Sequence, residues 1–428
     1  MKPAWFSPTA EAVDLLAELP AKVAALRASG ARFLAFPVTE IREAAEWALA
    51  CFHSPVTFVP LPPSLPPQVL EKRLAQLPGN VIFPSALRPA HAGASATLRP
   101  LEEIWAVIFS SGTTGTPKGI ALTGNSLKAS AEAHALHSGA ANATWLLDLP
   151  LFHVGGLSVL TRALFLDAPI ALSTPSAVST KEWIKSGRIH GLSQVPTTLV
   201  RLLRDPDINF AGISLILLGG APATQALVEE ARARGAPVRR TYGMTEHSSQ
   251  AATEKKPGGG LRALPGVEIK ICEGDEILLR SPALAAGIFE HGELKPLPLR
   301  DGFFPTGDLG SLKEGALTIF GRASELVISG GKKIYPAEVE AALAKVNGVG
   351  DCAVLGLPDA EWGEVLCAAV TESTPGMFRA EIAKTEMSAS LESHQIPKVW
   401  VLLPAIPRSP AGKILRPDLK RAVTQIQS

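Results

Sequence analysis

Short apolar runs alternate with helix-like segments between residues 104 and 245, and this pattern constrains the fold more than any other feature. The apolar runs cover residues 104–109, 120–123, 145–149, 169–172, 191–195, 213–218 and 238–242. Residues 225–234 are one of the helix-like segments, which Gly235 would end. The alternation predicts an α/β fold with mostly parallel sheets flanked by helices. In such sheets ligands bind beyond the carboxyl ends of the strands.

A second region with shorter, mixed segments begins after residue 321. Residues 336–346 predict a helix in which Val339, Leu343 and Val346 share one buried face. Runs at residues 352–357, 365–371 and 399–403 predict strands. Because 428 residues are too many for one hydrophobic core, we expect a separate α+β domain here, of roughly a hundred residues. The many prolines of residues 55–70 predict irregular surface chain.

Charge and cysteine content argue against several kinds of partner and site. The formal net charge is +1, which gives no support for binding nucleic acid or a membrane surface through bulk charge. The cysteines lack CxxC spacing and neighbouring histidine clusters, so we expect neither a zinc site nor a disulfide framework. They are Cys51, Cys272, Cys352 and Cys367.

We also expect a cytoplasmic protein without a membrane span. The N-terminal residues contain no apolar signal core. The most apolar stretch, residues 145–166, is interrupted by Asp148, Pro150, His153 and Arg162.

The strongest local signal is a loop of small and hydroxylated residues between two apolar runs. It reads Ser110, Ser111, Gly112, Thr113, Thr114, Gly115, Thr116, Pro117, Lys118 and Gly119. Small residues let the backbone approach phosphate oxygens, while hydroxyls and a lysine supply donors and positive charge. It is not a Walker A loop, because Gly119 follows Lys118 and a strand is predicted next. The alternative is a flexible linker, which seldom lies between two strands.

Two glycine loops follow neighbouring predicted strands. Gly219, Gly220 and Ala221 come after residues 213–218, and Gly243, Met244, Thr245 and Glu246 come after residues 238–242. A right-handed crossover would place both loops side by side at one sheet edge. There the glycines would admit a flat ring, Tyr242 could stack on it, and Glu246 could hold a magnesium ion. Taken alone, Tyr242 is more typical of a core residue and Glu246 of a solvated carboxylate.

Two weaker signals lie further along the chain. Asp308 is predicted to lie in a tight turn, where its carboxylate could accept both hydroxyls of a ribose, with Arg322 as a further donor. Lys413 lies in a loop rich in proline and glycine, residues 407–414, where a mobile side chain could be mounted. Ordinary turn chemistry and a solvated surface lysine are the alternatives.

At these residues the chain resembles the acyl-adenylate-forming superfamily of acyl-CoA synthetases, peptide-synthetase adenylation domains and luciferases. Residues 110–119, 242–246, 306–308, 321–322, 329–340 and 408–413 carry the resemblance and occur in the superfamily's order. It implies a large N-terminal domain (residues 1–321), a hinge (322–324) and a small mobile C-terminal lid (325–428), with the active site between the domains. Residues 149–157 and 192–199, and the short N-terminal region, most resemble the o-succinylbenzoate-CoA ligases of menaquinone synthesis.

The resemblance implies an ATP-dependent ligase that forms an acyl-adenylate and then an acyl-CoA thioester, here o-succinylbenzoyl-CoA. ATP, Mg²⁺ and coenzyme A would be required. Glu246 with Thr114 would organise Mg²⁺, and Lys413 would bridge the substrate carboxylate and the α-phosphate. The remaining nucleotide contacts would include Gly220, Ala221, Gly243 and Thr245. Coenzyme A would pass Gly330, Gly331 and Lys332.

His153, Ser193 and Gly219 are the candidates for the acyl pocket. His153 and Ser193 are equally consistent with buried residues bonded to the backbone. The second carboxylate of o-succinylbenzoate would need a donor or cation, which the sequence does not identify.

Departures from the superfamily's pattern and rival functions remain. Ser324 replaces the usual acidic residue or lysine after the hinge arginine, and Lys332-Lys333 stands where related ligases often have Glu-Asn. The alternatives are another aryl- or acyl-CoA synthetase, a stand-alone adenylation enzyme serving a carrier-protein thiol, a luciferase, and a non-catalytic nucleotide-binding protein. The sequence does not fix the oligomeric state, and a homodimer is a hypothesis.

Overall fold

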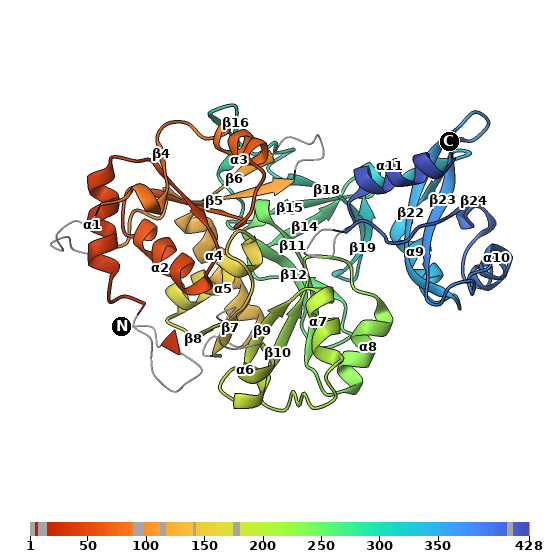
Figure 1. Cartoon of the computed structure of the whole chain (residues 1–428), viewed down its shortest axis with the longest axis horizontal. Helices are drawn as coiled ribbons and strands as arrows, with labels where there is room; N and C mark the ends of the chain where they lie inside the picture. Colours follow the sequence, from red (N-terminus) through yellow and green to blue (C-terminus); the bar gives the residue numbers. More distant parts are fainter. Residues whose placement is uncertain are drawn as a thin grey trace. The chain divides into compact units, whose positions relative to one another are not determined.

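The computed structural model describes residues 5–6, 15–88, 97–111, 117–139, 143–173, 180–408 and 414–427. The chain forms two compact units (Figure 1). The first comprises Met1–Glu268 and Leu279–Phe304, and the second comprises Ile269–Leu278 and Pro305–Ser428. Both mix helices and sheets, so the predicted α/β class is confirmed. None of the helices in the described part of the chain combines the length and apolarity that crossing a bilayer requires.

The first unit contains two sheets. The helices are α1 (Leu19–Ser29), α2 (Ile41–Phe52), α3 (Pro67–Leu74), α4 (Gly124–Ser138), α5 (Val154–Leu166), α6 (Thr180–Ser186), α7 (Pro196–Leu203) and α8 (Gln225–Ala233). One sheet runs in the order β1 (Trp5–Phe6), β8 (Ile170–Leu172), β7 (Trp145–Leu147), β9 (Gly191–Gln194), β10 (Leu215–Leu218), β11 (Val238–Met244), β12 (Ser249–Glu254) and β13 (Leu261–Ala263). The other runs β17 (Glu293–Lys295), β16 (Gly287–Glu290), β6 (Pro117–Thr123), β5 (Ile104–Ser111), β3 (Thr57–Leu61), β2 (Phe33–Pro37) and β4 (Val81–Ile82).

The central strands β7 to β11 are parallel, as the alternating pattern predicts. Several pairs of the first unit are antiparallel instead, among them β5 with β6, β6 with β16, and β11 with β12. Residues 55–70 also differ from the prediction of irregular chain, because they contain β3 and the start of α3. Pro60 lies inside β3, which is fully buried. The proline content of this region therefore led to the wrong prediction.

Among the described residues, three apolar clusters hold the first unit together, and two of them cover the sheet that contains β9 and β10. One lies between the two sheets and includes side chains of α2, α4 and α5. Within it, the Trp105 ring is 4.9 Å from that of Phe52 and 5.6 Å from that of Phe165 (centroid distances), which joins β5 to α2 and α5. The other core lies between the first sheet and α6, α7 and α8. The sheet with β9 and β10 is therefore covered on both faces, and its ligands must approach from an edge.

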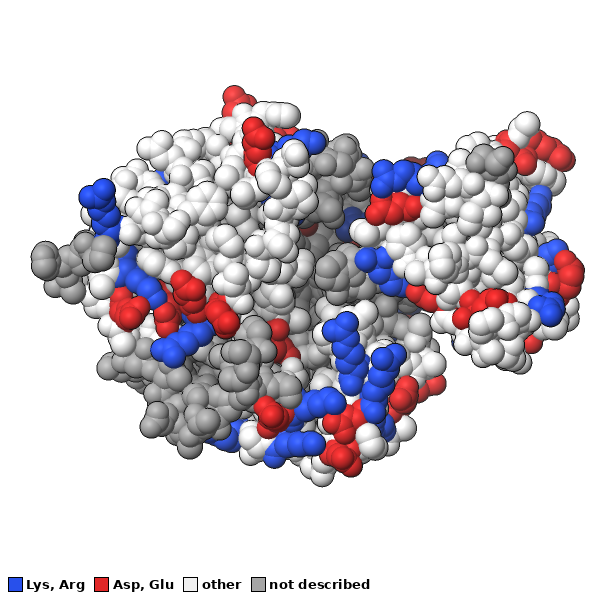
Figure 2. Space-filling view, viewed as in Figure 1, with Lys and Arg blue, Asp and Glu red and all other residues white. Residues whose placement is uncertain are grey.

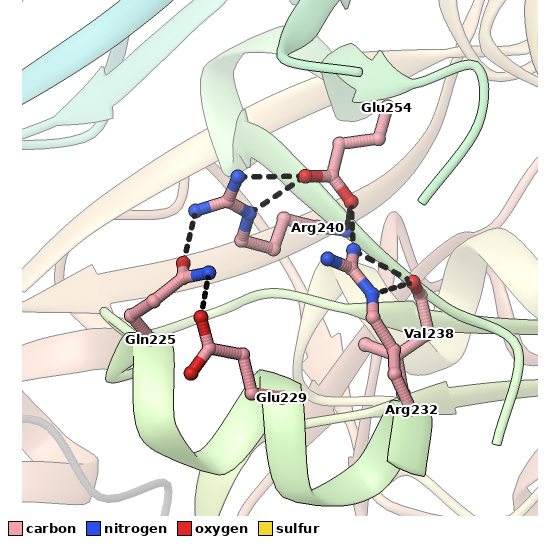
Figure 3. Close-up of polar contacts among 6 residues, drawn as sticks. All are labelled: Gln225, Glu229, Arg232, Val238, Arg240 and Glu254. Atoms are coloured by element: carbon pink, nitrogen blue, oxygen red, sulfur yellow. Dashed lines mark hydrogen bonds and ion pairs between the residues drawn. The ribbon is translucent and has the colours of Figure 1, made fainter. Parts of the chain in front are cut away.

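A buried carboxylate ties β11 to β12 and α8 (Figure 3). Glu254 is fully buried, and its Oε2 lies 2.5 Å from Arg232 Nη2 while its Oε1 lies 2.7 Å from Arg240 Nη2. The backbone N–H of Arg240 also donates to Glu254 Oε2, at 3.0 Å. Arg232 donates further to the Val238 carbonyl oxygen, at 3.0 Å and 3.2 Å. A buried charge needs such partners because desolvation alone costs several kcal/mol.

The second unit is built on antiparallel strands. Its first sheet has the order β19 (Ala316–Arg322), β18 (Phe304–Lys313), β15 (Glu276–Arg280) and β14 (Glu268–Ile271). The other has the order β21 (Lys332–Ile334), β20 (Val327–Ser329), β23 (Gly363–Glu372) and β22 (Val349–Asp359), with β24 (Val399–Leu402) parallel to β23. Its helices are α9 (Pro336–Leu343), α10 (Ala380–Met387) and α11 (Arg416–Gln427).

The elements predicted for this region are present. Helix α9 ends three residues earlier than predicted, yet Val339, Leu343 and Val346 are all buried. The three predicted strands correspond to β22, β23 and β24. On the face of the molecule in Figure 2, basic and acidic side chains are interspersed, in keeping with the net charge of +1.

Candidate functional site

The carboxyl ends of β9 and β10 are level with each other, and the neighbouring β11 continues beyond them to Met244. In the parallel register Leu218 of β10 lies beside Gln194 of β9 and Arg240 of β11. The N–H of Gly219 then donates to the Gln194 carbonyl oxygen, at 3.1 Å. Gly219 therefore follows β10 as predicted, whereas Gly243 and Met244 differ from the predicted loop because they lie inside β11, paired with β12.

Close backbone approach explains why glycines stand at this edge. A Cβ added at Gly219 would lie 2.6 Å from Thr241 Cγ2, and one at Gly243 would lie 1.8 Å from the Ser249 carbonyl oxygen. Gly220 has a φ of 77°, a left-handed conformation that side chains disfavour. Ala221 is half-buried, while Tyr242 is buried, as the core alternative for that residue expected.

Glu246 lies in the short 3-10 turn Thr245–His247 that follows β11. The turn is anchored because the N–H of Ala285 donates to the Glu246 carbonyl oxygen, at 2.8 Å. The Glu246 carboxylate is half-buried and makes no ion pair with the described residues. Such a group fits Mg²⁺, which usually binds proteins through one or two carboxylates and completes its shell with water and phosphates.

The phosphate-loop candidates begin and end on paired strands. Ser110 of β5 lies opposite Lys118 of β6, so both ends of the loop are held in an antiparallel ladder. Lys118 is half-buried and forms no ion pair within the described part of the chain. The loop residues between the strands, Gly112, Thr113, Thr114, Gly115 and Thr116, lie outside the described residues.

The two acyl-pocket candidates differ in exposure. His153 is the exposed residue that precedes α5, so the alternative of a buried histidine is wrong. Ser193 is buried, and its Oγ has no hydrogen-bond partner among the described residues. In register with Leu217, Ser193 faces the layer that contains α5.

Arg162 of α5 is a cation in this same layer that was noted in the sequence only as a break in an apolar stretch. It is 3% exposed, its Nη2 donates to Ser158 Oγ at 2.9 Å, and its guanidinium lies 4.5 Å from the centre of the Trp145 ring. Its Nη1 has no hydrogen-bond partner among the described residues, and none of their carboxylates pairs with it. Burial lowers the pKa of Arg162 to about 9. A lone arginine on the apolar face of a helix is the signal that would have found it.

Asp148, like Arg162, is visible in the sequence only as an interruption of an apolar stretch. Its Oδ2 accepts hydrogen bonds from Gln194 Nε2 and Thr180 Oγ1, both at 2.9 Å, while its Oδ1 is buried without a described partner. It therefore ties the ends of β7 and β9 to the start of α6. Burial raises the pKa of Asp148 from 3.8 to about 6, against the opposing effect of these hydrogen bonds.

In the second unit, Asp308 lies in strand β18 and not in the tight turn that we expected. Arg322 of β19 is its register partner, and Arg322 Nε lies 2.9 Å from Asp308 Oδ1. Arg322 also donates to the Thr306 carbonyl oxygen, at 3.0 Å. The pairing of the two strands places this carboxylate and this guanidinium together. Their contact with a ribose stays a prediction.

Gly330 and Gly331 form the two-residue turn of a hairpin between β20 and β21. Their φ angles of 55° and 76° suit a type I′ turn, which accounts for both glycines without a ligand. Lys332 follows as an exposed residue. Lys333 Nζ lies 3.1 Å from Asp275 Oδ2. Lys413 lies outside the described residues.

The chain is similar to known proteins in both sequence and structure. The family described as AMP-binding enzyme matches residues 83–289, and the AMP-binding enzyme C-terminal domain matches residues 338–413. The chain is 35% identical over 325 residues to a 2-succinylbenzoate–CoA ligase of Listeria monocytogenes, covering 73% of this chain and 69% of that one.

Solved structures agree with the sequence comparison. The o-succinylbenzoate CoA synthetase of Bacillus subtilis in complex with its acyl-adenylate intermediate is 28% identical, with a TM-score of 0.83 over 97% of this chain and 94% of that one. The same enzyme in complex with ATP and a magnesium ion has a TM-score of 0.84 at 28% identity, over 97% of this chain and 96% of that one.

We predict that Gly243→Ala destabilises the first unit, because its Cβ would overlap the Ser249 carbonyl oxygen. The expected loss is about 2–4 kcal/mol in the free energy of unfolding, measured by urea titration. Gly212→Ala is the matched control, since its Cβ would come no closer than 3.8 Å to another atom. Equal stability of the two variants would contradict the steric account.

The raised pKa of Asp148 predicts that the free energy of unfolding depends on pH. Its pKa of about 6 in the folded chain lies above the ordinary 3.8, so the folded state binds the extra proton between these values and loses stability as pH rises from about 4 to 6. Asp148→Asn removes this loss. Urea unfolding should therefore show the variant gaining up to about 2–3 kcal/mol over the parent as pH rises from 4 to 7. Asp167→Asn, at an exposed residue, is the control. A difference between Asp148→Asn and the parent that stays constant with pH would rule out the raised pKa.

Proposed function

Because this chain belongs to the family of AMP-binding enzymes, we propose that it is an ATP-dependent acid–CoA ligase whose acid is o-succinylbenzoate. The observation that carries the proposal is that Ser193, the Gly219–Gly220 loop and the Gly243–Glu246 segment lie on or directly after three adjoining strands of one sheet, β9, β10 and β11. The relatives named above support the choice of acid.

The chemistry has two steps. A carboxylate oxygen attacks the α-phosphorus of ATP, the bond to the bridging oxygen breaks, and pyrophosphate leaves with its electron pair. The thiol of coenzyme A then attacks the acyl carbon, loses its proton, and AMP leaves. The first step brings an anion to a polyanion, so positioning and charge screening must dominate catalysis.

The candidate residues fit these needs. Lys118 supplies an ammonium without an ion pair among the described residues at one end of the phosphate loop. The purine would lie against the segments that contain Gly219, Gly220 and Gly243, where close packing of the backbone already requires glycine. Glu246 would hold Mg²⁺ together with Thr114, and the ion would spread the charge of the phosphates. Asp308 and Arg322 would hold the ribose, and Gly330, Gly331 and Lys332 would line the path of coenzyme A.

Arg162 and Ser193 would meet the second carboxylate of the acid. Each has a buried polar atom without a described partner, on the same side of the sheet. Leaving such groups unsatisfied costs about 1–3 kcal/mol each, more when charged, and an anion that enters this layer would recover that cost. His153, exposed at the start of α5, would contact the aryl part.

The proposal includes motion of a C-terminal lid. Residues 1–321 would form the adenylation domain, 322–324 the hinge and 325–428 the lid that carries Lys413. The second compact unit also contains residues 269–278 and 305–321, so this hinge is a proposal about motion and not a boundary between compact units. A cytoplasmic location completes the proposal, and a homodimer remains a hypothesis.

Lys413→Ala should separate the two steps. If Lys413 bridges the carboxylate and the α-phosphate, the variant loses adenylate formation by about a hundredfold or more, yet converts supplied acyl-adenylate to thioester at nearly the parent rate. Pyrophosphate exchange and thioester formation measure the two steps, with the exposed Lys420→Ala as control. Equal loss in both steps would falsify the assigned role.

Arg162→Met should discriminate between acids. Pyrophosphate release is measured for o-succinylbenzoate, for the two mono-acids that each keep one of its carboxylates, and for other aryl and aliphatic acids, with and without coenzyme A. We expect o-succinylbenzoate to be preferred, and the variant to lose about tenfold to a hundredfold in kcat/KM for it alone.

Exposed Arg201→Met on α7 is the control, which should keep the preference. An unchanged preference in Arg162→Met would exclude the arginine from recognition. No pyrophosphate release with any acid would exclude the ligase itself.

A further inference from the structure

We propose a second binding site in the first unit, for a small organic anion, at the sheet edge opposite the glycine loops. A cavity of about 380 Å³ lies there, lined by Ser138, Gly139, Ala143, His190, Ser214, Leu215 and Arg239. Its volume is within the usual range for small-molecule sites, near the lower end.

The position of the cavity separates it from the nucleotide site. His190 precedes β9, Leu215 is the first residue of β10, and Arg239 is the second residue of β11. Because these strands are parallel, His190 and Leu215 mark amino ends, whereas the glycine loops follow carboxyl ends. Arg239 is in register with Leu217, so it reaches the cavity from further along the sheet. The four residues of β10 span about 13 Å, so one ligand of this size cannot occupy both edges.

Arg239 gives the cavity its charge. Side chains alternate along a strand, so Arg240 points to the face where Glu254 neutralises it and Arg239 points to the other face. Within the described part of the chain, the side chain of Arg239 makes neither an ion pair nor a hydrogen bond. Its guanidinium group belongs to a half-buried residue, and its N–H donors have no partner among the described residues.

The lowered pKa values of two neighbouring histidines indicate a positive electrostatic potential around Arg239. Burial is the largest cause that lowers the pKa values of His134 and His137, and the charge of Arg239 adds to both decreases. Arg162 contributes to the first and Lys255 to the second, and no carboxylate appears among the charges that act on either ring. The carboxyl end of α4 adds about half a negative charge, which one guanidinium more than offsets.

His190 supplies a second directed donor. The N–H of Thr144 donates to His190 Nδ1, at 3.3 Å, so the neutral ring carries its hydrogen on Nε2. Ala143 and Leu215 offer apolar contact. A guanidinium fork, a ring N–H and two apolar side chains suit a carboxylate or phosphate group on a compact carbon skeleton.

Calorimetric titration of the full-length protein tests the site, with benzoate and phenyl phosphate as probes and benzyl alcohol as the neutral comparison. We expect both anions to bind the parent and Arg201→Met, and benzyl alcohol not to bind. Arg239→Met should weaken this binding by about tenfold or more. Ser214→Leu, which fills the cavity and leaves Arg239 in place, should weaken it as well. The anion that binds more tightly identifies the preferred group.

Both probes could also enter the nucleotide and acyl site, so Lys118→Met and Arg162→Met are titrated in parallel. Anion binding that survives both of these changes and is lost in Arg239→Met supports the second site. Binding that Arg239→Met and Ser214→Leu leave at the parent level, or that only Lys118→Met or Arg162→Met removes, overturns it. Thermal unfolding of each variant against Arg201→Met excludes misfolding, and Ser214→Leu decides the outcome if Arg239→Met is unfolded.

Discussion

The fully buried carboxylate of Glu254 is the interaction on which the first unit's geometry depends. It fixes β12 to β11 and, through Arg232, fixes both to α8. Strand β11 carries Tyr242 and Gly243 at its far end, so the position of that end follows from a charge cluster several residues away. A buried ion pair is weak evidence for stability, because well-packed apolar side chains often replace it at no loss. Here it fixes the register of β11 and β12, because a carboxylate with two guanidinium partners and a backbone N–H donor permits only one alignment of the two strands.

Much of this fold could be predicted from the period of apolar residues. The central parallel strands and α8 follow from short apolar runs separated by helical segments, and α9 follows from Val339, Leu343 and Val346 on one face. The errors have physical causes. Proline content argued against structure in residues 55–70, yet Pro60 lies in a strand buried on both faces, where apolar contacts outweigh the missing donor. Asp308 looked like a turn residue because local composition does not reveal which strand pairs with which.

The candidate site likewise has parts that the sequence reveals and parts that it does not. Loops marked by glycine, threonine and lysine are visible in a sequence because they depart from ordinary composition, and crossover geometry places two of them side by side. Arg162 and Asp148 are invisible by that criterion, since each is a single polar residue inside an apolar stretch. Ser193 is a candidate only through the family resemblance. Burial alone reveals that one polar atom of each of these three residues has no described partner.

The contrast between paired and unpaired arginines explains how a chain of nearly zero net charge can handle anions. Arg232 and Arg240 are neutralised by Glu254, so they contribute little to any ligand. Arg162 and Arg239 have no such partner among the described residues. Because a desolvated cation acts at short range through a low dielectric, a few such residues can replace a broad basic surface. Their isolation also costs stability in the empty protein, since burial depresses the pKa of Arg162 to about 9. An anion that pairs with such a residue recovers this cost, so binding and folding stability must be linked at both edges of the sheet.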